Sequence, residues 1–171
     1  MTGYRQFINK IWNASRFALM NLGDDAVRAE VPAASSLGLV HRWILHRLNA
    51  VTGEVQEALA TYRFDVAADR LYHFFWHEYA DWYIEMVKQH LQASGAERDT
   101  ACAVLVEVHD RVLRLLHPII PFVTEELWQH LPRRAEDGQT ITLAPFPAVR
   151  ADWVDAGVEA EIGLVQDVVT T

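Results

Sequence analysis

Amide and cationic side chains with helical spacing lie near the start of the chain and are the residues best suited to bind a ligand. Asn9, Asn13 and Arg16 follow one another at i, i+4 and i+7, so a helix would carry them on one side. Carboxamides and guanidinium groups hydrogen-bond to the edges of nucleic-acid bases, and arginine also binds phosphate. The pattern fits base recognition, but a solvated polar helix face has the same spacing and is the commoner explanation of spacing alone.

An aromatic cluster at residues 72–83 is a second candidate. Tryptophan and tyrosine at this density most often fill a hydrophobic core. They also form platforms on which bases stack, and they line grooves for partner proteins. The composition of the segment leaves all three interpretations open.

Two histidines in this segment have the spacing of a metal site. His73 and His77 are four residues apart with Glu78 and Asp81 beside them, so a helix would place two imidazoles on one face. The HExxH order of zinc metalloproteases is absent. We therefore expect no metal and interpret the pair as two histidines on a partly buried aromatic helix.

Catalytic motifs are missing from the chain. It contains no GxxxxGK[ST] phosphate loop, no GxGxxG and no GxSxG, so no catalytic residue is predicted. His117, directly before Pro118, is expected to bind the C-terminal end of a helix. Cys102 is the single cysteine, which excludes an intramolecular disulfide, and it is expected in the core.

Length, composition and charge narrow the class of protein. The chain has 171 residues, 51% of them hydrophobic, which is typical of a globular domain. It has no apolar run of membrane-spanning length and no apolar signal sequence, so we expect a cytoplasmic protein without membrane contact. Its net charge of −8 argues against a generic nucleic-acid binder. The charge is uneven, however: residues 1–22 contain three cations and no acid, and residues 151–171 contain five acids and no Lys or Arg.

Apolar periodicity predicts an all-α fold, an antiparallel bundle of about five helices followed by a tail helix. The bundle is assigned to residues 1–150 and the acidic tail helix to residues 151–171. The expected helices are 4–22, 37–60, 65–91, 98–117, a short helix after Thr124, and 153–168. The third, apolar on more than one face, is expected to be central.

Local signals suggest where these elements end. Gly23 is the expected C-terminal cap of the first helix. Asp65 and Thr124 are the expected N-caps of the third helix and of the short helix. Residues Thr140–Leu143 are expected to be extended.

Three segments carry a resemblance to a known family. Residues 4–17, YRQFINKIWNASRF, resemble the opening helix of the anticodon-binding domain of valyl-tRNA synthetases. Residues 75–83, FWHEYADWY, are similar to that family's third-helix signature. Residues 115–128, LLHPIIPFVTEELW, resemble a sequence shared by the valine, isoleucine and leucine enzymes. The three occur in the family's order and span most of the chain.

The resemblance implies a helical bundle that binds the anticodon stem-loop of valine tRNA. It further implies a parent valine–tRNA ligase that uses ATP and Mg, in which the catalytic and editing domains lie elsewhere on the polypeptide and a coiled coil follows the tail helix. The chain would then be an excised domain with no cofactor and no activity of its own. A monomer is the expected state.

Roles for single residues follow from the resemblance, which implies that the first helix and the end of the third face the anticodon. Asn9 and Asn13 are expected at base edges, and Arg16 at a base or phosphate. Trp82, and more weakly Tyr83, are the expected stacking residues. Arg5 and Lys10 are expected on the RNA backbone, whereas Phe7, Ile11 and Phe17 are expected in the core.

Two other classes of function compete with RNA binding. One is a stand-alone protein-interaction module that kept the fold and lost RNA binding, which would have no use for Asn9, Asn13 and Arg16 together. The other is a metalloenzyme that uses His73, His77, Glu78 and Asp81. Both rank below the RNA interpretation.

Overall fold

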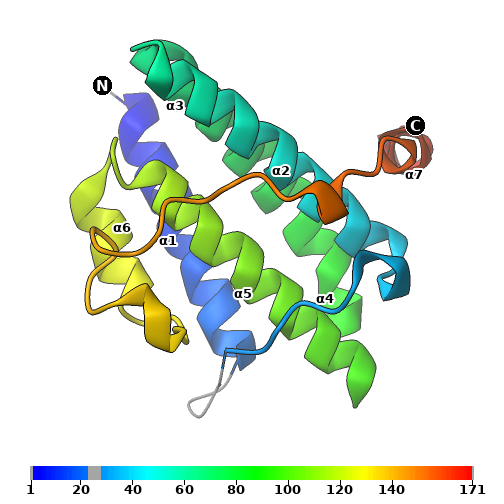
Figure 1. Cartoon of the computed structure of the whole chain (residues 1–171). Coiled ribbons are helices and arrows are strands. Elements are labelled where there is room, and N and C mark those ends of the chain that lie inside the picture. The colour runs from blue at the N-terminus through cyan, green and yellow to red at the C-terminus, as the bar shows by residue number, and fades with distance from the viewer. Residues whose placement is uncertain (1, 23–27, 171) are drawn as a thin grey trace.

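Seven α-helices build the computed structural model, which describes residues 2–22 and 28–170. Over these residues it contains helices and loops and no strand (Figure 1). None of the described helices is long and apolar enough to cross a membrane. The helices are α1 (Thr2–Leu22), α2 (Leu39–Ala60), α3 (Phe64–His73), α4 (Ile84–Gln92), α5 (Ala96–Leu116), α6 (Pro121–Trp128) and α7 (Gly157–Thr170).

The predicted third helix is one continuous rod with a change of winding in its middle. A π-helical segment, η2 (Phe74–Tyr83), joins α3 to α4 without a break. Short 3₁₀ turns occur at Ala34–Ser36 (η1), Ala135–Asp137 (η3) and Ala151–Trp153 (η4). The predicted helices therefore all exist, and the π winding and the short 3₁₀ turns have no counterpart in the sequence analysis.

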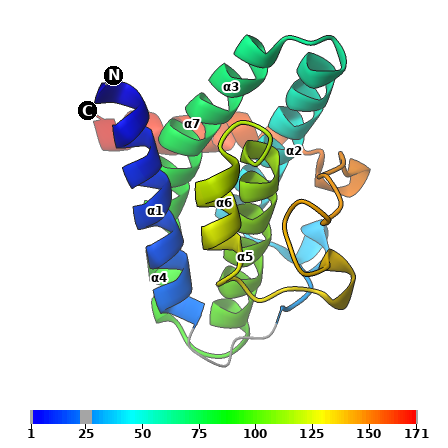
Figure 2. The same cartoon turned by 90° about the vertical axis from the view of Figure 1, so that its left-hand side faces the viewer.

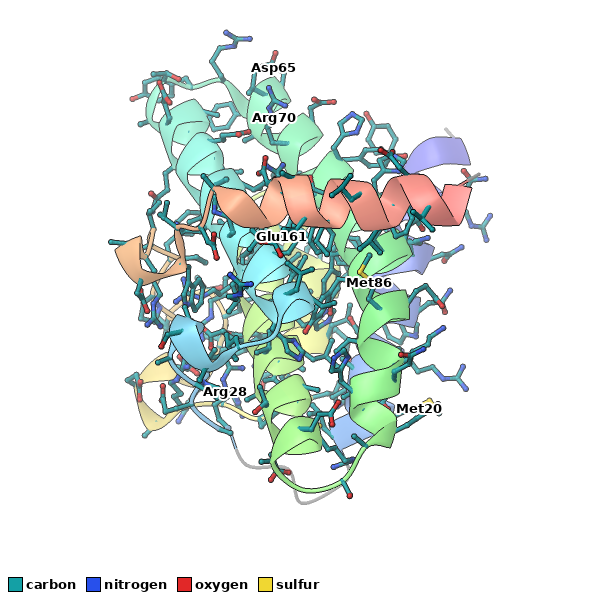
Figure 3. The ribbon with its side chains drawn as sticks, turned by 90° about the vertical axis from the view of Figure 1, so that its right-hand side faces the viewer. Met20, Arg28, Asp65, Arg70, Met86 and Glu161 are labelled. Atoms are coloured by element: carbon teal, nitrogen blue, oxygen red, sulfur yellow. The ribbon has the colours of Figure 1, made fainter. Side chains whose placement is uncertain are left out.

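Helix α5 occupies the centre of the bundle. It contacts α1, α2, α3, α4 and α6, and most of its side chains are buried (Figures 1 and 2). The expectation that the third helix would be the central one is therefore wrong: α5 is central, and the η2 and α4 parts of the third helix keep one side exposed. Helix α7 lies across α2, and its Val158 and Ile162 join the same core as the bundle (Figure 3). The assignment of residues 151–171 to a separate tail unit stays a prediction.

Several expected caps and turns are wrong in detail. Asp65 is the second residue of α3 and pairs with Arg63, so it does not cap the helix. Helix α6 begins three residues before Thr124, at Pro121, whose fixed φ suits a first helical position. Gly23 lies outside the described residues. The helix boundaries nevertheless agree with the predicted ones to within a few residues.

The predicted extended segment Thr140–Leu143 is also wrong, whereas His117 is the C-cap residue of α5, at the helix end where it was expected. The Nδ1 atom of His117 lies 2.8 Å from the Thr124 hydroxyl, and its Nε2 atom lies 3.1 Å from that of Thr142. The side chain of His117 thus ties α6 to the loop that follows it. That loop forms a turn, in which Thr140 and Ile141 donate hydrogen bonds to Glu125.

A buried charge network holds the loops against α5. Glu107 accepts hydrogen bonds from Arg28, Arg111 and Arg134 at 2.6–2.8 Å. Burial alone would raise the pKa of Glu107, but the three guanidinium groups outweigh it and lower that pKa to about 2. One turn along, Asp110 accepts from the Trp128 indole nitrogen at 2.6 Å and from two arginines.

Two buried histidines make the fold sensitive to acid. Burial lowers the pKa of His109 to about 4, and burial together with the neighbouring His90 lowers that of His41 to about 4. His109 is enclosed by Ser15 and Tyr79, whose hydroxyls lie 2.7 and 2.9 Å from its ring nitrogens. Both histidines are therefore neutral in the folded chain at neutral pH.

We expect the free energy of unfolding to fall as the pH drops from 7 to 5. The unfolded chain takes up protons at an ordinary histidine pKa near 6.5, whereas the folded chain resists them until about pH 4. Each histidine then removes about 2 kcal/mol by pH 5, before the carboxylates contribute. Urea titrations from pH 7 to pH 5 measure the loss. His109→Gln should remove about half of it, and a flat profile in the unaltered chain would contradict the account.

Candidate nucleic-acid interface

The outward side of α1 carries the three predicted base-reading residues. Asn9, Asn13 and Arg16 are all exposed, as is Arg5 near the start of the helix. None of these four side chains makes a hydrogen bond or an ion pair with any other described residue. The opposite side of α1, with Ile11 and Ala18 fully buried, packs into the bundle. Helix α1 therefore presents free donors and acceptors on a fixed support.

Phe7 and Phe17 lie at the edges of this buried side. Both are partly buried and packed against the core, so their prediction is confirmed along with that of Ile11. Phe7 contacts the rings of Tyr72, Phe75 and Trp76, with centroid separations of 5.0, 5.7 and 6.5 Å. These contacts fix the position of α1 relative to η2.

Lys10 is held between two side chains of η2. Its Nζ atom lies 2.5 Å from a carboxylate oxygen of Asp81 and 5.0 Å from the centre of the Trp76 ring. Trp76 and Asp81 are five residues apart, which in an α-helix would separate them by about 140° around the axis. A π-helix closes its hydrogen bonds from i to i+5, so residues five apart lie much closer to the same side than in an α-helix. The π winding thus allows one ammonium group to contact both.

A groove runs between α1 and the η2–α4 rod. Its α1 wall consists of Lys10, Asn13, Ala14 and Phe17, and its other wall consists of Ala80, Ile84, Glu85 and Lys88. The two lysines lie on opposite walls, and Asn13 lies on the α1 wall with Ala14 and Phe17. We call this the α1–α4 groove. It offers what an unstacked base needs: apolar surface for its face, an amide for its edge and cations for its phosphate.

The two predicted stacking residues do not line this groove. Tyr83 is fully buried, stacked on Tyr79 at 5.9 Å, with its hydroxyl 3.4 Å from His41. Burial raises the pKa of Tyr83 well above its usual value. A ring enclosed in this way has no face available to a base, so the prediction for Tyr83 is not carried forward.

Trp82 is partly buried and packed against the core. Glu78, nearly one turn before it, pairs with Arg47 of α2, which also pairs with Glu159 of α7. Met86, one turn after it, lies on the face that α7 crosses (Figure 3). Trp82 therefore belongs to the α2–α7 side of the rod, and Trp76 is the tryptophan that contacts α1.

Trp76 and Lys88 are the residues that sequence reasoning missed. The aromatic cluster at 72–83 did indicate a stacking platform, but choosing its member on the α1 side required the π winding. Lys88 follows Glu85 by three residues, and this spacing predicts an ordinary ion pair on the helix surface. Its position opposite Asn13 is visible only in three dimensions.

The proposed metal-ligand residues are not brought together. The rings of His73 and His77 stack with centroids 5.6 Å apart, and each faces its own aspartate, Asp69 or Asp81. Glu78 is turned away toward Arg47. Within residues 2–22 and 28–170, no group of three or more His, Cys, Asp or Glu side chains is arranged to hold a metal ion. Cys102 is partly buried beside Asn21.

Comparison with known proteins gives one family match. A family model described as the anticodon-binding domain of tRNA ligase matches residues 41–171. The chain is 48% identical over 165 residues to a valine–tRNA ligase of Geobacter sulfurreducens, which covers 95% of this chain and 18% of that protein. It is 46% identical over 166 residues to one of Thermotoga maritima, covering 97% and 18%. The chain thus spans less than a fifth of these relatives' length.

A solved structure shares the fold. The Agrobacterium radiobacter K84 agnB2 LeuRS–tRNA–LeuAMS ternary complex matches with a TM-score of 0.63 over 90% of this chain and 17% of that one. The sequence identity is 17%. This likeness extends to the helical architecture alone.

Proposed function

Because the chain belongs to the family of anticodon-binding domains of tRNA ligases, we propose that its α1–α4 groove reads the anticodon loop of a valine tRNA. Asn13 and Asn9 would hydrogen-bond to base edges, and Arg16 to a base or a phosphate. Arg5 and Lys10 would bind the RNA backbone. The observation that carries the proposal is the set of exposed amide and guanidinium groups on α1, which pair with no other described residue and stand beside a groove whose walls are partly apolar and partly charged.

Trp76 is the aromatic side chain best placed to take part. It is partly buried and packs against Phe7 and Lys10 of α1. Its indole would extend the apolar surface next to Lys10 for a base leaving the loop. Trp82, on the α2–α7 side, is the weaker candidate.

The rest of the function belongs to a longer polypeptide. We propose a parent valine–tRNA ligase of the cytoplasm, in which separate domains hold ATP and Mg and attach valine to the tRNA. The bundle itself would bring no cofactor and no catalytic residue, and would act as a monomer. With several domains on one tRNA, each contact can be weak, because linkage raises the overall affinity. We expect a dissociation constant for the chain alone in the micromolar range or weaker, which corresponds to about −8 kcal/mol at best.

A titration of two RNAs tests the proposal. One is a stem-loop with a valine anticodon, and the other has the same stem with all three anticodon bases replaced. We expect the chain to bind the first more tightly by about tenfold at low salt, and both less tightly as salt rises. Equal binding would reduce the domain to a backbone clamp. Absence of binding to either RNA at high micromolar concentration would favour a protein-interaction module instead.

A further inference from the structure

Both lysines of the α1–α4 groove are already paired with carboxylates of the η2–α4 rod. The Nζ atom of Lys10 lies 2.5 Å from Asp81, across the gap between the helices. The Nζ atom of Lys88 lies 2.7 and 2.6 Å from the two carboxylate oxygens of Glu85. Lys10, Lys88 and Glu85 line the groove, and Asp81 pairs with Lys10 from the rod, so these four residues together carry no net charge.

These acids contribute little to the stability of the fold. The side chains of Asp81 and Glu85 are 40% and 61% exposed, and exposed ion pairs add little because water and salt screen them. Glu85 lines the groove together with Asn13, and Asp81 pairs with Lys10, so both acids oppose lysines that a phosphate chain would otherwise find unpaired. We therefore expect Asp81 and Glu85 to affect RNA binding more than they affect the stability of the fold.

We propose that Asp81 and Glu85 compete with RNA phosphates for Lys10 and Lys88 and so hold down the affinity of the groove for RNA in general. A phosphate that approaches either lysine must share the ammonium group with the carboxylate or displace it, and the charge of the carboxylate repels the phosphate. RNA that offers phosphates alone gains little from that exchange, whereas a loop whose bases also bond to Asn13 gains the base contacts in addition. The inference rests on the proposed function and adds a control on its affinity.

The π winding makes the competition at Lys10 possible. It stacks Trp76 and Asp81 on one side, so the ammonium group can leave the carboxylate while staying over the ring. Lys88 has a similar second contact, since its Nζ atom lies 6.0 Å from the centre of the Phe17 ring. Each lysine thus keeps an apolar support when its anionic partner changes.

Neutral isosteres test the competition. Asp81→Asn, Glu85→Gln and the double variant are titrated with both stem-loops over a range of salt concentrations, beside Lys10→Ala. We expect each single variant to bind both RNAs about three- to tenfold more tightly at low salt. The slope of log affinity against log salt should steepen by about 0.7–0.9 for each lysine released. Asp65→Asn, which removes the same charge from an exposed ion pair at the start of α3, should change neither quantity.

The outcomes separate this inference from the proposed function. If Asp81 merely positions Lys10 for RNA, Asp81→Asn will weaken binding as Lys10→Ala does, and the inference is overturned. Unchanged affinities in the double variant overturn it too, even where the unaltered chain prefers the valine loop. Tighter binding of both RNAs by the double variant supports the inference. It does so even if the unaltered chain shows no preference between the loops, a result that would contradict the proposed function alone. Thermal melts of each variant verify that the fold is retained.

Discussion

Replacing Asp110 with alanine is expected to lower the free energy of unfolding by about 3–5 kcal/mol, the largest effect of any single substitution considered. Asp110 is buried on α5, so water cannot readily replace its carboxylate as the acceptor for the groups that donate to it. One carboxylate oxygen accepts from Trp128 at 2.6 Å and from Arg114 at 3.1 Å, and the other accepts from Arg28 at 3.1 Å. Truncation would leave an indole N–H and two buried guanidinium groups short of acceptors, which is the costly case.

Thermal and chemical denaturation measure this loss directly. For a chain of this length, the expected change corresponds to a fall in Tm of about 6–20 °C. Asp110→Asn keeps the shape and one acceptor and should fall between the alanine variant and the unaltered chain. Asp65→Ala removes an exposed aspartate and is expected to change the free energy by less than about 0.5 kcal/mol. A loss below about 1 kcal/mol for Asp110→Ala would mean that water reaches the network.

Replacing Asn13 with alanine is expected to weaken binding of the valine stem-loop by about 5- to 150-fold. This range corresponds to the loss of about 1–3 kcal/mol, which is what two hydrogen bonds from one amide to a base contribute. The affinity for the loop with replaced anticodon bases should change little, so the preference between the loops disappears. Asn13 is exposed and makes no hydrogen bond or ion pair with another residue that the structure describes, so the effect should come from the interface alone.

Gln139→Ala is the matched control for this substitution. It also removes an exposed carboxamide, but from the loop after α6, away from the α1–α4 groove. We expect its affinities for both RNAs to equal those of the unaltered chain. Equal weakening of both RNAs by Asn13→Ala would instead assign Asn13 to the RNA backbone and contradict its role in base reading.

Long-range apolar periodicity made the helices predictable, whereas their ends depended on local chemistry that several residues could satisfy. The turn between α2 and α3 illustrates this. Tyr62 adopts a φ of 58°, and the backbone N–H groups of Tyr62 and Arg63 bond to carbonyls of the last turn of α2. A left-handed backbone at a tyrosine carries no sequence signal, since glycine is the residue expected there. Asp65, whose residue type is typical of an N-cap, is therefore the residue that the sequence indicates, although the N-cap of α3 is Arg63.

The candidate site was predictable on α1 and not on its partner rod. Every residue of α1 follows an ordinary helical period, so Asn9, Asn13 and Arg16 could be placed on one side from spacing alone. On η2 the wider π winding changes which side chains share a side. The same aromatic cluster then places Trp76 against α1, packs Trp82 against the core and buries Tyr83.

An NMR titration of the ¹⁵N-labelled chain with the valine stem-loop tests most directly whether the α1–α4 groove is the RNA site. We predict that shift changes will cluster at residues 5–17 and 76–88, including the side-chain amides of Asn9 and Asn13. The loop with replaced bases should leave those two amides unmoved. Changes centred on α6 or α7, with the signals of α1 unaltered, would contradict the account.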